Sequence, residues 1–455
     1  MGRMIGVDLG ATHSRVAVME GASPRVIPNQ DGSRATPTLV AFSEDGEPRV
    51  GEAARRQAIQ DPRASVVAVL PLLGRKLDAR AAREGGRWTR GRLAAAVNGD
   101  LRVVVAGEAL SAPEIAAHLL GHLKAAVEHQ LGETVDEAVI AVPSSFNDLQ
   151  RQAARDAGSI AGLRVARLVN RSTAAALGLG LESCDRRNVA ICDFGPSSFD
   201  VSILEIDDGW VQVRATAGMP DEPDEALLES AAALGRRCLA DARLAPEQVD
   251  EALLLGGQAP MGVSDMVQRV FGKPPRLRTD LDESVVRGAA IQAGILQGEV
   301  GDLVLLDVTP HTLGIETKDG TFTPVIERNT TIPTRKRRVF TTIADSQTRV
   351  LVHVLQGESD LAAYNKSLHK FELLEIPRAP RGKPQIEVAF GIDVNGAMSV
   401  EANDQETGCR QAIRVEASGG LSRAEVERLA ARGLAKEPRR ASSPGRRLVS
   451  MSQTA

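Results

Sequence analysis

The strongest constraint on this fold is a change of hydrophobic periodicity near residue 300. Before that point, apolar stretches of strand character alternate with stretches of helical spacing, such as residues 111–132. Beyond it, apolar positions alternate one by one, as in residues 386–392, and Asn395-Gly396 supplies a hairpin turn. The first pattern indicates a layered α/β domain, and the second indicates an all-β sandwich. One chain therefore carries two folds of different class.

Length and composition agree with two or more folding units. The chain has 455 residues, of which 43% are hydrophobic, so each unit can bury a core. The 55 basic and 59 acidic residues nearly balance, which gives no general attraction to nucleic acid or to an anionic membrane. No apolar run approaches the roughly 18 residues that cross a bilayer. The four cysteines lack metal-ligand or redox spacing. We expect a cytoplasmic protein with free thiols.

Two similar turns mark the first domain. The DLG segment at residues 8–10 and the DFG segment at 193–195 each join two apolar strands. Such a turn can present backbone N–H groups to a phosphate, and its carboxylate can hold Mg²⁺ through water. One strand–Asp-x-Gly–strand is usually a plain hairpin, but a third turn at 256–257 makes a nucleotide cleft between two lobes the favoured interpretation. The residues predicted to bind the nucleotide are Asp8, Gly10, Thr12, Asp193, Gly195, Ser198, Gly256 and Gly257, with the metal held by Asp8 and Asp193.

Ordered motifs along the chain resemble the DnaK-type heat-shock chaperone family. IGVDLGATHSRVAV resembles its first phosphate motif, and AVIAVPSSFNDLQRQAARDAG, CDFGPSSFD, LLLGGQAPM and GAAIQAGIL resemble later segments of its nucleotide domain in the same order. LVLLDVTPHTLGIET resembles its interdomain linker and first sandwich strand, and VHVLQGE, NKSLHKFEL and IDVNG continue the match. The resemblance extends from residue 4 to about residue 428.

The resemblance implies an actin-like two-lobed ATPase domain followed by an all-β sandwich that binds peptides. We place the nucleotide domain at residues 1–300, with part of its second lobe missing, and the linker at 301–308. The sandwich follows at 309–421. A short helix at 422–436 is expected to be a remnant of the family's lid. Residues 437–455 have little apolar content, and we expect a disordered tail.

The nucleotide domain departs from the family at positions that carry catalysis. The family's phosphate-transferring lysine aligns with Leu70, and the glutamate of its NEPTAAAL segment aligns with Arg171. Pro196 stands where the second turn has a glycine, and a proline offers no N–H to a phosphate. After Gly218, the helix that holds the adenine ring in the family has no counterpart. The resemblance therefore implies that ATP or ADP with Mg²⁺ binds weakly or not at all, that hydrolysis is impaired, and that no catalytic residue can be assigned.

The β domain keeps the motifs that form the family's peptide cleft. The match implies that extended apolar segments of unfolded proteins bind by strand-like main-chain bonds and a central apolar pocket. Contact between the domains is expected at Leu305, Leu306 and Asp307, and Arg167 matches a surface that J-domain co-chaperones use. Apolar strand residues are usually core residues, but the positions aligned with the cleft are Ile315, Phe340, Ile343, Val350 and Val352.

Three functions fit these residues. The first is a chaperone-like protein that binds extended apolar segments with little or no nucleotide control. The second is a working ATP-driven chaperone, because Asp8, Asp193 and the linker are retained. Measured ATP affinity separates these two. The third is a sugar kinase of the same superfold, against which the sandwich and the linker argue. Neither nucleic acid nor a membrane is expected as a partner.

Overall fold

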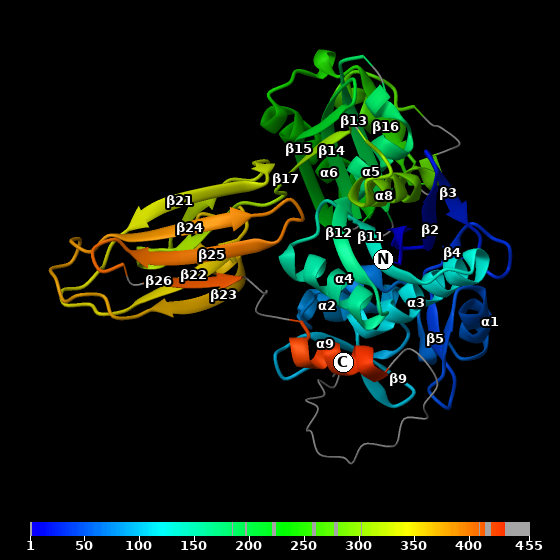
Figure 1. Cartoon of the computed structure of the whole chain (residues 1–455), viewed down its shortest axis with the longest axis horizontal. Helices are drawn as coiled ribbons and strands as arrows, with labels where there is room; N and C mark the ends of the chain where they lie inside the picture. The colour runs from blue at the N-terminus through cyan, green and yellow to red at the C-terminus, as the bar shows by residue number, and fades with distance from the viewer. Residues whose placement is uncertain are drawn as a thin grey trace.

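Two bodies of different class follow each other along the chain, as the change of periodicity predicts (Figure 1). Helices and strands alternate up to α8 (Leu281–Gln297), and β17 (Val304–Val308) leads from there into a body built of strands. The computed structural model describes residues 2–183, 185–195, 198–220, 224–256, 261–276, 281–301, 303–408, 410–414 and 420–432.

The first lobe of the nucleotide domain is built on a six-stranded mixed sheet. The central strand β1 runs parallel to β11 and antiparallel to β2. In spatial order its strands are β12 (Arg164–Asn170), β11 (Val135–Val142), β1 (Arg3–Asp8), β2 (His13–Glu20) and β3 (Ser23–Ile27), with β4 (Thr36–Pro37) beside β2. The edge of the lobe adds α1 (Glu52–Gln60), α2 (Ala79–Glu84) and two small sheets, β6 (Pro48–Val50)–β5 (Val40–Phe42)–β7 (Ser65–Val66) and β10 (Glu108–Ser111)–β9 (Leu101–Val105)–β8 (Arg92–Ala95).

Local sequence signals set the boundaries of the main helix of this lobe, α3 (Ala112–Leu131). The Ser111 hydroxyl accepts the N–H of Glu114 at 3.2 Å, and the Glu114 carboxylate accepts the N–H of Ser111 at 3.1 Å. This reciprocal capping satisfies two of the amide groups that have no partner inside the helix. Gly132 ends the helix in the left-handed region, at φ 67°. The buried face of α3 joins the core of the lobe together with α4 (Asp148–Ile160).

The second lobe is built on another six-stranded sheet, to which the linker adds a strand. β17 runs parallel to β15 and antiparallel to β20. Between β15 and β16 the described residues form one α-helix, α6 (Asp224–Ala242), and a 3-10 turn, which fits the predicted loss of a larger helical segment. The helix α7 (Val263–Phe271) packs on α6 in this lobe, whereas α8 packs on α5 (Arg171–Gly178) and on strands β1, β2, β3 and β11 of the first lobe. The strand order is β16 (Glu251–Leu255), β13 (Arg187–Gly195), β14 (Ser198–Asp207), β15 (Trp210–Pro220), β17 and β20 (Thr331–Ile332).

The second body, here called the β unit, consists of two four-stranded antiparallel sheets that share one core. Val354 of β22 and Phe390 of β24 are among the fully buried residues that join the sheets. One sheet has the order β19 (Phe322–Ile326), β18 (Leu313–Glu316), β22 (Val350–Gln356) and β23 (Lys366–Leu373). The other has the order β21 (Thr334–Phe340), β24 (Ile386–Ile392), β25 (Met398–Asp404) and β26 (Arg410–Arg414).

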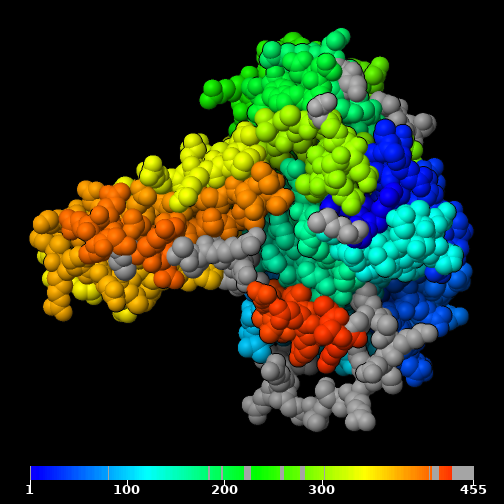
Figure 2. Space-filling model, viewed as in Figure 1, coloured from blue at the N-terminus to red at the C-terminus, as the bar shows by residue number. Residues whose placement is uncertain are grey.

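The predicted C-terminal helix is present as α9 (Arg423–Arg432), but it lies on the nucleotide domain (Figure 2). Leu429 is buried in the core of the first lobe, and α9 packs on α4. The Gly420 N–H, just before the helix, donates to Asp100 at 2.7 Å. Within the described residues, this helix therefore covers part of the first lobe and not the β unit. Residues 433–455, which include the rest of the predicted helix and the predicted tail, lie outside the described residues.

Two further predictions from composition concern the thiols and the membrane. Cys192 and Cys238 are buried free thiols, whereas Cys184 and Cys409 lie outside the described residues. In the described part of the chain, no helix is both long and apolar enough to cross a membrane.

Candidate nucleotide cleft and interdomain contacts

The two Asp-x-Gly turns meet across a cavity between the lobes. Asp8 ends β1 of the first sheet, and Asp193 lies near the end of β13 of the second. Both are nearly inaccessible, with 2% and 6% of their surface exposed. The cavity measures about 340 Å³. It is lined by every described residue predicted to bind the nucleotide, namely Asp8, Gly10, Thr12, Asp193, Gly195, Ser198 and Gly256; Gly257 lies outside the described residues.

Glycine is required where the third turn touches the second. Gly256 has a φ of +95°, which L side chains rarely adopt, and a Cβ atom there would overlap the carbonyl group of Phe194. Gly10 is restricted in the same way by the carbonyl oxygen of His13. The lack of a side chain at Gly256 therefore lets the third turn approach the second, and the lack of one at Gly10 lets the first turn close on itself.

Arg171 fills the space between the two aspartates. It is the first residue of α5, so its side chain starts directly after β12, between the two sheets. Its Nε donates to Asp193 Oδ2 at 2.7 Å, and its Nη1 donates to Asp8 Oδ1. Only 17% of the Arg171 side chain is exposed. A guanidinium group with its fixed fork of donors suits two carboxylates better than an ammonium group does.

Burial and charge together shift the pKa values of Arg171 and of Asp200, a buried carboxyl group near Asp193. Burial disfavours the charged form of Arg171, but the carboxylates of Asp193 and Asp8 outweigh it and raise the pKa of the guanidinium further. Burial, followed by the nearby Asp193 carboxylate, raises the pKa of Asp200 to about 7, although the Ser145 N–H donates to it at 2.5 Å. Arg171 is therefore a permanent cation, and Asp200 is a carboxyl group that titrates near neutral pH.

A hydrated magnesium ion does not fit this arrangement of the aspartates. In the predicted site, Asp8 and Asp193 would hold Mg²⁺ through water, which requires room for the ion and its water shell. Here one oxygen of each carboxylate is bound directly to Arg171. Among the described residues, no group of three or more His, Cys, Asp or Glu side chains could hold a metal ion. The Asp-x-Gly turns and the resemblance both predict magnesium at this position, and the direct bonds of both carboxylates to Arg171 argue against it.

The wall of the cleft that carries a lysine in the family is apolar in this chain. Leu70 begins the short 3-10 helix Leu70–Leu72 and is 3% exposed. It lines the cleft but belongs to the core of the first lobe. His13 also lines the cleft, and burial together with Arg15 and Arg55 lowers its pKa, so its ring is neutral at pH 7. No positive charge therefore reaches the cleft from the position of Leu70.

A comparison with protein families agrees with this geometry. The family model described as Hsp70 protein matches residues 4–222 and 221–439, which together are nearly the whole chain. This chain belongs to the Hsp70 family. The membership supports a chaperone-type function and, for the family in general, binding of ATP or ADP with Mg²⁺, of unfolded peptides and of J-domain co-chaperones. The altered cleft is thus a variation within an Hsp70 protein.

The five positions predicted to bind peptide differ in how deeply the structure buries them. Ile315 and Val352 face the core of the β unit. Phe340 and Val350 are partly buried at its edge, and Ile343 is 64% exposed. Apolar alternation in a strand identifies a face but does not say whether that face meets the core or a ligand. The assignment of these residues to a peptide cleft remains a prediction.

The predicted linker residues lie against both lobes. Asn170 donates to the two carboxylate oxygens of Asp307 at 2.9 and 3.1 Å. Leu305 packs on the core of the second lobe, and Leu306 is partly buried. Arg167 lines a cavity between the first lobe and the β unit, near Asp307, and burial lowers its pKa. Its predicted role toward a J-domain co-chaperone remains a prediction.

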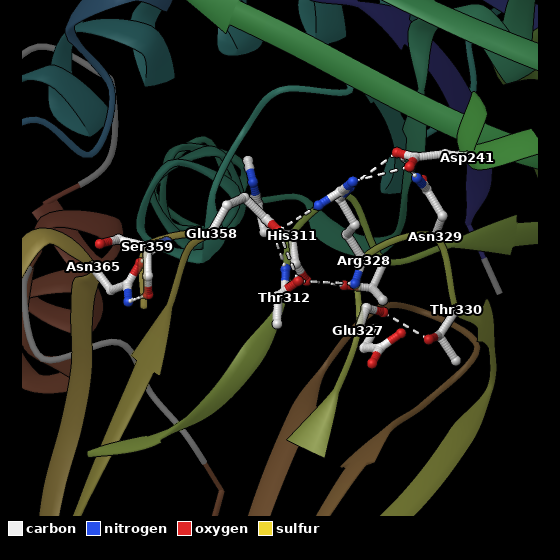
Figure 3. Close-up of polar contacts among 11 residues, drawn as sticks. Asp241, His311, Thr312, Glu327, Arg328, Asn329, Thr330, Glu358, Ser359 and Asn365 are labelled. Atoms are coloured by element: carbon white, nitrogen blue, oxygen red, sulfur yellow. Dashed lines mark hydrogen bonds and ion pairs between the residues drawn. The ribbon is translucent and has the colours of Figure 1, made fainter. Parts of the chain in front are cut away.

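Polar contacts that the sequence did not predict hold the β unit on the second lobe (Figure 3). Arg328 donates to both oxygens of Asp241, in α6, at 2.9 Å each, and to Glu358 at 2.9 Å. Asn329 also donates to Asp241, at 3.0 Å. Glu358 in turn accepts the N–H and the hydroxyl of Thr312, each at 2.9 Å. These partners are 30 to 88 residues apart, so no local sequence pattern announces them.

A second set of contacts holds the β unit on the first lobe. Gln356 donates to the Asp148 carboxylate at 2.8 Å, and Arg155 donates to the carbonyl oxygen of Asn395 at 2.8 Å. His311 lies 3.2 Å from the carbonyl oxygen of Ser145. The β unit therefore contacts both lobes at once.

Proposed function

We propose that this Hsp70 protein binds extended apolar segments of unfolded proteins, and that its nucleotide domain binds ATP weakly and hydrolyses it at a negligible rate. The observation that carries the proposal is the position of Arg171, whose guanidinium group bonds to both Asp8 and Asp193. Each of the two carboxylates available to a metal–nucleotide complex thereby already has one oxygen bonded to a cation of the chain itself.

Two departures act on the chemical step. Phosphoryl transfer depends on positioned cations that stabilise charge on the transferred group. Leu70 supplies no charge in the wall where the family has its lysine. Removing one such stabilising group typically costs about 3 kcal/mol, or roughly a hundredfold in rate. Arg171 supplies a positive charge at another wall, but its Nε and Nη1 are already bonded to carboxylates.

The β unit is the part of the chain that supports peptide binding. It keeps the ordered strand motifs of the family, and apolar side chains such as Ile343 and Leu351 are about half exposed or more, at 64% and 54%. The family match extends through this unit. Because α9 lies on the nucleotide domain, this helix would not cover a bound segment. We therefore infer that the β unit binds a peptide segment but releases it quickly, so that a fast off-rate determines its affinity.

A second candidate, a fully ATP-driven chaperone, is favoured by one observation. The described residues predicted to bind nucleotide all line a single cavity. Phosphate release by the purified chain separates the candidates, with Asp193→Asn as the control for contaminating ATPases. Turnover above background that is lost in Asp193→Asn supports the second candidate.

Peptide release tests the proposal directly. A fluorescent Leu-rich peptide is bound to the full chain and chased with unlabelled peptide, with and without Mg²⁺ and ATP, in a stopped-flow instrument. We expect release within seconds and the same rate in both conditions. Slow release that ATP accelerates would contradict the proposal.

A further inference from the structure

Arg171 and its chain neighbour Asn170 connect the cleft to the linker. Asn170 is the last residue of β12, and its side-chain amide binds the Asp307 carboxylate of β17. Its Oδ1 accepts a hydrogen bond from Arg151 at 2.6 Å, which fixes the orientation of the amide. The next residue, Arg171, binds Asp8 and Asp193. The group that joins the lobes and the group that holds the linker are thus adjacent in sequence.

The charge of Arg171 lies where the two lobes meet. Asp8 belongs to the sheet of the first lobe and Asp193 to the sheet of the second, so the bridge joins the lobes. Without a cation between them, two nearly buried carboxylates would repel each other and would lack compensation for their burial. The guanidinium group therefore favours the arrangement in which the two turns face each other.

The docked position of the β unit depends on the relative position of the lobes. Arg328 binds Asp241 of the second lobe, and Gln356 binds Asp148 of the first. β17 also extends the sheet of the second lobe beside β15. If the lobes moved apart, the two sets of contacts could not both persist. Docking of the β unit on both lobes therefore requires the lobes to keep this arrangement.

We propose that Arg171 acts as a tethered cation, which holds the lobes together and keeps the β unit docked on both of them without nucleotide or divalent metal. The disagreement between the cleft and a magnesium ion is then a functional property of the chain. The proposal concerns docking and does not depend on whether the β unit binds peptide.

Energy transfer in the full-length chain tests this inference. One label is attached at Val97, which is 98% exposed in the first lobe, and the other at the exposed Arg381 of the β unit, both through unnatural amino acids. We expect the same transfer efficiency in EDTA, in Mg²⁺ and in Mg²⁺ with ATP. A wild-type chain that undocks in EDTA, or that changes with ATP, would overturn the proposal.

The second part of the test repeats the energy-transfer measurement after substitution of Arg171. Arg171→Glu places a third carboxylate in the cleft, and we expect the undocked fraction in EDTA to rise at least about tenfold and to fall again when Mg²⁺ is added. Arg63→Glu makes the same charge change at an exposed site and should leave docking unchanged. If Arg171→Glu does not fold, as judged by circular dichroism, Arg171→Gln is measured in the same way. Docking in EDTA that survives either folded variant refutes the role of Arg171.

Discussion

The nucleotide cleft and the β unit differ in the groups that they leave open to a ligand. In the cleft, the carboxylates of Asp8 and Asp193 are buried and bonded to a cation from the same chain. In the β unit, apolar groups such as Ile343 and Leu351 stay exposed to solvent. A site that is satisfied internally gains little from an external ligand, whereas exposed apolar surface gains from being covered. We therefore expect the exposed apolar surface of the β unit to respond to an added ligand more strongly than the cleft does.

Removing the internal cation of the cleft should have the largest effect, which we expect on the stability of the nucleotide domain. Arg171→Met leaves two nearly buried carboxylates without a partner, which should lower the free energy of unfolding of the nucleotide domain by about 3 kcal/mol. Arg63→Met, at an exposed site, is the matched control and should change it little. Denaturant unfolding followed by circular dichroism measures both. Equal stability of the two variants would show that the bridge contributes nothing.

Filling the predicted peptide pocket should produce the next largest effect. Val350 is partly buried at the edge of the core of the β unit, and Val350→Phe should exclude a Leu side chain of the peptide. Burial of one Leu is worth roughly 2 kcal/mol, so affinity for a Leu-rich peptide should fall about thirtyfold. Fluorescence anisotropy gives the affinity, and circular dichroism verifies the fold. A folded variant with unchanged affinity would remove Val350 from the pocket.

A smaller effect is expected on the pH dependence of stability, because of the buried Asp200. The pKa of Asp200 is raised to about 7 in the folded protein, above the ordinary value of 3.8. The folded state therefore binds more protons than the unfolded state between these pH values, and its stability falls as pH rises. For one such group the loss between pH 6 and pH 7 is about 1 kcal/mol. The slope of unfolding free energy against pH in this range should be less negative in Asp200→Asn, and an unchanged slope would contradict the assignment.

Sequence patterns predicted the elements better than they predicted the site. The capping pair Ser111 and Glu114 fixed the start of α3, and the Asp-x-Gly turns led to the cleft because each pattern is local. Arg171 was recognised as a departure, but its bonds to Asp8 and Asp193 span 163 and 22 residues. Only the arrangement of the two sheets brings those side chains together.

In the β unit, too, sequence patterns predicted the elements but not the contacts between distant residues. Alternation predicted its strands, and Val352 and Ile343 both suited a peptide cleft in the sequence. The structure buries Val352 in the core and leaves Ile343 exposed. No sequence pattern predicted the contacts of Arg328 with Asp241 and Glu358, because a single charged residue in a loop is usually a surface residue. Which face of a strand meets the core, and which loop charge finds a partner, is decided by tertiary packing.

A calorimetric titration of the full chain with ATP in the presence of Mg²⁺ tests the central claim most directly. We predict no measurable heat of binding at micromolar ATP, because Arg171 is already bonded to both carboxylates and Leu70 offers no charge to the phosphates. Asp193→Asn should behave like the natural chain. Binding of one ATP per chain with micromolar affinity, lost in Asp193→Asn, would contradict the account and show that the cleft still works as a nucleotide site.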